Sequence, residues 1–150
     1  LTTQDLTEEL VVDSFLAVAH RYGLPQIVKT DHDKLWYDAV SGLPSRLTRV
    51  LSALGVYHLL VGPKQPWWNG VVERYVRTCR QEVVLPPPAD SVTVPQALET
   101  ARPFYNEQRC HSRCQDQPPA TVYQASARRL PPGFDPAQAP FTQEALSIRF

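Results

Sequence analysis

Two carboxylates in the first half of the chain have the sequence context of metal ligands. Asp31 directly follows a short segment, residues 26–30, that is typical of a strand, and functional side chains often follow strands in open α/β sheets. Glu73 lies one turn inside a predicted helix that starts after a loop rich in proline and tryptophan. Two carboxylates brought together would repel each other unless a cation lay between them. Their hard oxygen atoms suit Mg²⁺ or Mn²⁺, which also bind phosphate oxygens.

The elements around these carboxylates alternate between helix and strand. Thr7 as an N-cap, acidic residues in the first turn and Gly23 as a stop predict a helix over residues 7–22. Further predicted elements are strands at 26–30 and 56–61 and helices at 44–54 and 70–84, the last with a buried face of Val72, Val76, Cys79 and Val83. This order predicts an α/β sandwich with some parallel pairing. Because two strands are too few for such a sheet, we expect further strands before residue 1.

The second half of the chain contains most of the fifteen prolines and is expected to be more loosely organised. Three consecutive prolines at 86–88 predict a semi-rigid linker. A helix follows at about 95–106, kinked at Pro103, then a short helix at 121–128 and a possible terminal strand. The predicted organisation is therefore a core at 1–85, a linker and helical extension at 86–128, and a tail at 129–150.

Several short motifs, in order, resemble one family. They are YGLP at 22–25, TD at 30–31, LGV at 54–56, PWWNGVVER at 66–74, YNEQRCHS at 105–112 and PATVY at 119–123. The most specific is Asn69-Gly70-x-x-Glu73-Arg74, which opens a helix after a proline loop. Together they resemble the C-terminal part of the DDE-type, retroviral-integrase-like catalytic core of bacterial insertion-sequence transposases.

The resemblance implies an RNase H-like α/β fold and metal-dependent DNA cleavage and strand transfer, as in DNA integration and transposition. Asp31 would be the second and Glu73 the third of three carboxylates that hold two Mg²⁺ or Mn²⁺ ions, and the first would lie upstream. The partners implied are DNA, as transposon ends and target, and further copies of the same chain. Three alternatives stay open: an active core, an inactive remnant that binds DNA or a partner, and a nuclease that only hydrolyses.

The helix that carries Glu73 also has the spacing of a DNA-binding face. Glu73, Arg77 and Arg80 share one side and Arg74 borders it, so the arginines are placed to contact phosphates. The predicted DNA-binding set is completed by the loop residues Lys64 and Asn69. The plainer interpretations are an ion pair between Glu73 and Arg77, or a solvated charged face. Trp67 and Trp68 would either stack on bases or pack the loop onto the core.

Composition limits the other possibilities. Fifteen Lys and Arg balance fifteen Asp and Glu, so a basic surface must be local. The chain has no run approaching the about 20 apolar residues of a membrane span, and its three cysteines do not make a disulfide framework. We therefore expect a cytoplasmic protein. Cys110, His111 and Cys114 are ligand types, but their spacing does not match a standard zinc site.

Overall fold

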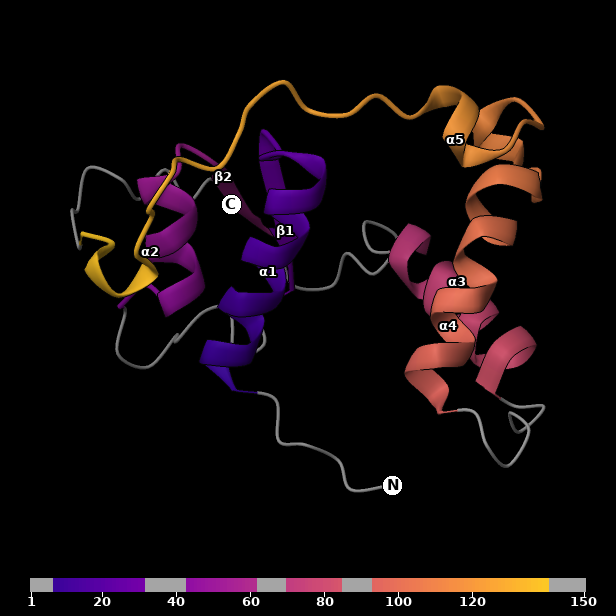
Figure 1. Cartoon of the computed structure of the whole chain (residues 1–150), viewed down its shortest axis with the longest axis horizontal. Helices are drawn as coiled ribbons and strands as arrows, with labels where there is room; N and C mark the ends of the chain where they lie inside the picture. The colour runs from indigo at the N-terminus through magenta and orange to yellow at the C-terminus, as the bar shows by residue number, and fades with distance from the viewer. Residues whose placement is uncertain (1–6, 32–42, 62–69, 85–92, 141–150) are drawn as a thin grey trace. The chain divides into compact units, whose positions relative to one another are not determined.

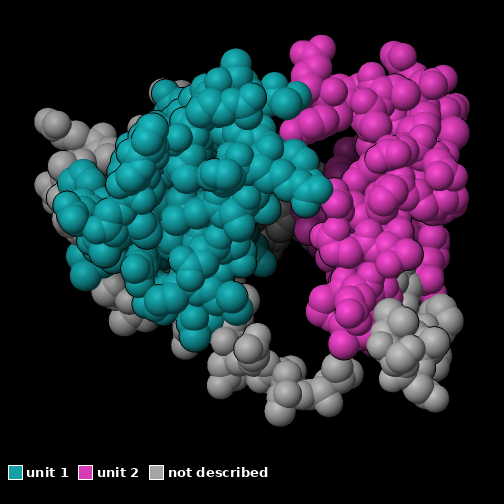
Figure 2. Space-filling view, viewed as in Figure 1, with its two compact units in different colours: residues 1–65, 125–150 teal, residues 66–124 magenta. Residues whose placement is uncertain are grey.

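The computed structural model describes residues 7–31, 43–61, 70–84 and 93–140 (Figure 1). The chain divides into two compact units (Figure 2). The first unit consists of residues 1–65 and 125–150, and the second unit of residues 66–124. The predicted module boundaries near residues 85 and 128 stay predictions.

The first unit opens with helix α1 (Glu8–Tyr22). The Thr7 hydroxyl accepts a hydrogen bond from the Leu10 N–H at 3.2 Å, which satisfies one of the free N–H groups of the first turn. The helix ends at Gly23, whose φ of 86° lies in the left-handed region and whose N–H donates to the Ala19 carbonyl at 2.8 Å. The helix predicted over residues 7–22 is confirmed.

A parallel pair of strands follows, joined through a helix. Strand β1 (Ile27–Thr30) pairs with β2 (Tyr57–Leu60), and Thr30 lies opposite Leu60. Helix α2 (Arg46–Ala53) connects them, with Ser45 as its N-cap. The predicted parallel pairing is confirmed. Within the described residues the sheet has these two strands and is accompanied by helices, which agrees with the predicted α/β class in outline.

The core of the first unit lies between α1, α2 and the inner face of the sheet. Its largest fully buried side chains are Val12, Val50, Leu51 and Leu60. Residues 125–140, here called the returning segment, pack onto this core through side chains from distant sequence, namely Leu130, Phe134 and Ala139.

The short helix predicted over residues 121–128 is wrong in position. Within the predicted range only Thr121 and Val122 are helical, as the end of a single turn, α5 (Pro119–Val122), and the backbone from Tyr123 to Arg128 is non-helical. Proline is favoured in the first turn, which explains why α5 begins early. The later residues bond to the first unit instead, since the Leu24 N–H donates to the Arg128 carbonyl at 2.8 Å. These tertiary hydrogen bonds replace the local ones of a helix.

The second unit is helical in its described residues. Helix α3 (Gly70–Cys79) continues into a π-helical turn, η2 (Arg80–Val84), and α4 (Val94–Pro103) continues into another, η3 (Phe104–Gln108). Thr93 and Gln96 form a capping box that starts α4. The predicted interruption at Pro103 takes the form of the change from α to π geometry, as expected where a ring removes a backbone donor.

The buried face predicted for α3 is wrong at two positions. Val72 and Val76 are 59% and 55% exposed, and Cys79 is half-buried; the Val83 side chain lies outside the described residues. The reason is that α3 packs on α4 and η3 through a different side. Tyr75 lies on that side, with its ring edge-to-face against Tyr105 at a centroid distance of 5.1 Å.

Candidate metal and DNA site

Asp31 lies where the sequence placed it, one residue beyond the end of β1, and its side chain is exposed. The residue before it is held by the neighbouring strand, because the Val61 N–H donates to the Thr30 carbonyl at 2.8 Å. His32 and Asp33, which follow, lie outside the described residues. The first unit therefore presents one carboxylate at the C-terminal end of a parallel strand, a usual location for ligand-binding side chains.

A buried polar network lies behind Asp31, and the sequence analysis missed it. The ring of His58 on β2 lies 2.8 Å through Nε2 from the Thr30 hydroxyl and 2.8 Å through Nδ1 from the Thr48 hydroxyl. The Thr48 hydroxyl in turn lies 3.0 Å from the Ser45 hydroxyl. Burial lowers the pKa of His58 to about 4, so the ring is neutral near pH 7. The one signal available in the sequence was a histidine inside an apolar strand.

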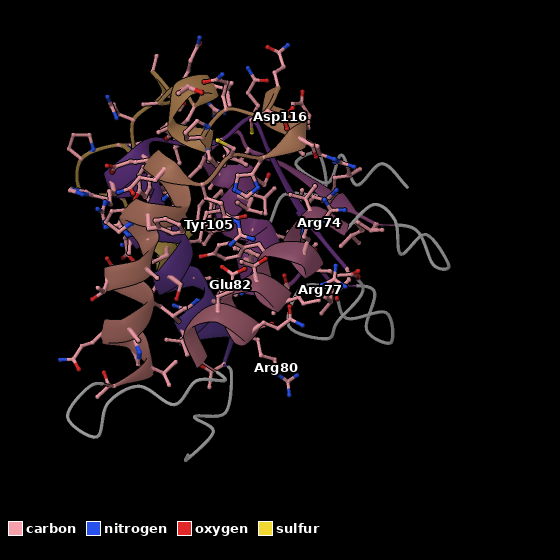
Figure 3. All side chains as sticks on the ribbon, turned by 90° about the vertical axis from the view of Figure 1, so that its right-hand side faces the viewer. Arg74, Arg77, Arg80, Glu82, Tyr105 and Asp116 are labelled. Carbon is pink, nitrogen blue, oxygen red and sulfur yellow. The ribbon has the colours of Figure 1, made fainter. Side chains whose placement is uncertain are left out.

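Glu73 and the three predicted arginines are exposed in the second unit. In Figure 3, Arg74, Arg77 and Arg80 extend from one side of α3 and η2, whereas Glu82 and Tyr105 lie on the other side. Within the described part of the chain Glu73 makes no ion pair with Arg77, so the proposed helical salt bridge is not formed. The second unit therefore presents a carboxylate among cationic side chains that are accessible to an anionic ligand.

The opposite side of α3 is used for packing. Arg109, the residue after η3, forms an ion pair with Glu82 of η2, and the Tyr105 ring also contacts the His111 ring at a centroid distance of 4.8 Å. A cavity of about 40 Å³ between these elements has room for little more than water. Burial raises the pKa of Tyr105 above its ordinary value. This side holds α3 against α4 and leaves the arginine side outward.

The remaining predicted site residues fall into two groups. Lys64, Asn69, Trp67 and Trp68 lie outside the described residues. Cys110 is exposed and Cys114 half-buried, and over the described ranges no three histidine, cysteine or acidic side chains form a group that would hold a metal ion. Of the two predicted carboxylates, Asp31 belongs to the first unit and Glu73 to the second.

Comparison with known families agrees with the resemblance seen in the sequence. Residues 54–119 match the integrase core domain family. The matched segment begins at the end of α2 and contains β2, α3 and α4, with Glu73 and the three arginines; Asp31 lies before it. The match confirms the resemblance to a DDE-type integrase or transposase core and supports a function of that type. No helix in the described ranges has the length and apolar composition that a membrane crossing requires.

Proposed function

We propose that this chain is part of the catalytic core of a transposase or integrase that cleaves DNA and joins strands with the help of divalent metal ions. The observation that carries the proposal is the family match around Glu73, because that carboxylate lies exposed on a helix side that also presents arginines. Metal-dependent phosphoryl transfer needs ligands for the metal ions and cationic groups for the DNA phosphates, and this helix side offers both kinds of side chain.

Asp31 and Glu73 fit the implied cation by the chemistry of their donors. Carboxylate oxygens are the side-chain ligands that Mg²⁺ and Mn²⁺ prefer, and both side chains are exposed. When bound, the ions would supply activation of a water or 3′-hydroxyl and stabilisation of the leaving oxygen. The two carboxylates would hold the ions and orient them toward the scissile phosphate. Neither carboxylate needs to accept a proton for this role.

The arginine side of α3 and η2 would hold the DNA backbone. Arg74, Arg77 and Arg80 are spaced along slightly less than two helical turns and would contact neighbouring phosphates rather than base edges. Lys64 and Asn69 are proposed to extend this surface from the preceding loop. Because the contacts are to phosphates, this surface would bind transposon ends and target DNA alike. We further propose that the full-length protein acts as a homo-oligomer, since two DNA ends must be joined to one target.

DNA binding is tested by anisotropy of a fluorescent duplex titrated with the full chain. The double variant Arg77→Ala/Arg80→Ala should weaken binding about tenfold or more and reduce the slope of log K against log salt by about 2. The double variant Arg113→Ala/Arg129→Ala is the charge-matched control, because both arginines are exposed and lie outside α3 and η2, with Arg113 on η4 (Ser112–Cys114). Equal losses in the two proteins would show that net charge, and not the α3 surface, sets the affinity.

Catalysis is tested with the full-length protein on supercoiled plasmid carrying transposon ends. We expect Mg²⁺-dependent nicking that is lost in Asp31→Asn and in Glu73→Gln and retained in Asp13→Asn, an exposed mid-helix control on α1. Binding without any metal-dependent nicking would identify an inactive DNA-binding module instead. Nicking without joining of a 3′-hydroxyl donor would identify a hydrolytic nuclease.

A further inference from the structure

The polar residues that are buried in the described part of the chain belong to one network. They are Ser45, Thr48 and His58, with exposed fractions of 5%, 4% and 6%. Their hydrogen bonds run from the N-cap of α2, across the core, to Thr30 at the end of β1. The network ends beside Asp31, because the Thr30 hydroxyl donates to the Asp31 carbonyl at 3.2 Å.

The hydrogen bonds of the network are consistent with a single direction. In this direction the Thr30 hydroxyl donates to the Asp31 carbonyl, and the Thr30 oxygen accepts from Nε2–H of the Nε2-protonated tautomer of His58. His58 Nδ1 is then unprotonated and accepts from the Thr48 hydroxyl, whose oxygen accepts from Ser45. This arrangement needs a neutral ring, and burial, which lowers the pKa of His58 to about 4, provides one.

Thr30 is therefore held to β2 by its backbone and by its side chain. Its carbonyl accepts from the Val61 N–H at 2.8 Å, and its hydroxyl is bonded to His58 at 2.8 Å. Strand ends usually fray, and a second attachment through the side chain restrains the torsions that set the direction of the next residue. That next residue is Asp31.

The network is not needed to fill the core. Valine has nearly the shape of threonine, and burying polar groups costs free energy unless every donor and acceptor is satisfied. Ser45 is required as the N-cap of α2, but apolar side chains at Thr30, Thr48 and His58 would give comparable stability with fewer geometric demands. The polar network instead fixes the orientation of Thr30, and therefore of the backbone that leads to Asp31. Residues that hydrogen-bond around a metal ligand fix its orientation in the same way.

We propose that His58 and Thr30 are positioning residues, which set the backbone at Asp31 so that its carboxylate is oriented to bind a divalent cation. The inference rests on the proposed function, in which Asp31 is a metal ligand. It assigns a role to His58 that is separate from folding. Neither residue touches the metal or the DNA in this proposal.

The test uses the full chain and Mn²⁺ alone, with paramagnetic broadening of the Thr30 and Asp31 amide signals as the measure of affinity. Thr30→Val keeps the side-chain shape and removes the hydroxyl, so we expect about tenfold weaker binding. Thr30→Ser keeps the hydroxyl and should bind within about twofold of wild type, since both hydrogen bonds are retained. Urea unfolding of the same proteins separates an effect on affinity from an effect on stability.

The outcomes distinguish the positioning role of Thr30 and His58 from metal binding by Asp31 itself. Broadening centred on Asp31 in wild type, lost in Asp31→Asn and unchanged in Thr30→Val, overturns the positioning role and leaves the metal site standing. Wild-type broadening that Asp31→Asn does not change overturns the metal site and, with it, the inference. If Thr30→Val does not fold, His58→Leu fills the ring's place with an apolar side chain, and it should weaken Mn²⁺ binding to the same extent.

Discussion

Arg128 is predicted to be the main attachment of the returning segment to the rest of the first unit. Its guanidinium donates to three backbone carbonyls, Pro25 at 2.8 Å and Leu54 and Gly55 at 2.7 and 2.9 Å. The last two carbonyls lie at the C-terminal end of α2, where helical partners are missing and a cation is favoured. Arg128→Ala removes all three bonds at once.

The expected loss follows from these three bonds. A hydrogen bond from a charged donor contributes about 1.5–3 kcal/mol when buried, but Arg128 is half-exposed and water replaces part of each bond. We therefore assign about 1 kcal/mol to each bond and expect the free energy of unfolding of the first unit to fall by about 3 kcal/mol. Arg128→Lys keeps the charge without the planar fork and should lose an intermediate amount.

Amide hydrogen exchange at Val50 and Leu51 measures this loss, because both residues are fully buried in α2 and report on the first unit alone. A loss of about 3 kcal/mol corresponds to exchange about 100-fold faster. Arg129→Ala is the matched control, since Arg129 is exposed, and its effect should stay within about 0.5 kcal/mol. Equal exchange in the two variants would refute the attachment role of Arg128.

Two further predictions concern the same unit. Gly23→Ala should lower the free energy of unfolding by about 3 kcal/mol or more, since a Cβ would lie 2.7 and 2.8 Å from carbonyl oxygens of the returning segment. Gly133 also has a left-handed φ but open surroundings, so Gly133→Ala should cost only about 1 kcal/mol. Equal losses in the two variants would contradict the predicted clash at Gly23. Acid should destabilise the unit through His58. Its folded pKa of about 4 is below the unfolded value of 6.5, so the unfolded state binds more protons and the stabilisation, complete above pH 6.5, falls by about 3 kcal/mol by pH 4. Urea titrations across that range should show this part missing in His58→Leu and present in a His20→Gln control on the exposed side of α1.

The local features of the fold were predictable because their causes lie within a few residues. Thr7 caps α1 through an N–H three residues later, and Gly23 ends it through a backbone conformation that other residues avoid. Asp31 was correctly placed beyond a strand, because a short β-rich segment before a polar residue is a local pattern. The resemblance that points to Glu73 likewise rests on residues close together in the sequence, the motif Asn69-Gly70-x-x-Glu73-Arg74.

The errors occurred where a distant partner decides the outcome. Val72 and Val76 have helical spacing for a buried face, but burial depends on which side of α3 meets α4, and the aromatic pair of Tyr75 and Tyr105 selects another side. Periodicity identifies an apolar stripe without naming what covers it. The helix predicted near residue 125 failed for a related reason, since its backbone bonds to Leu24 instead.

The sequence by itself therefore indicated the resemblance that the family match at residues 54–119 confirms, and it predicted the local boundaries of α1 and the strands, because each depends on neighbouring residues. Only the tertiary structure showed the buried hydrogen-bond network that ends at Thr30, the residue before Asp31. The contact between His58 and Thr30 joins residues 28 positions apart, and it exists because two parallel strands place both side chains on the buried face of the sheet. A hydrogen bond between such distant residues leaves no periodic signal in a single sequence, and that is why it became visible only in the folded chain.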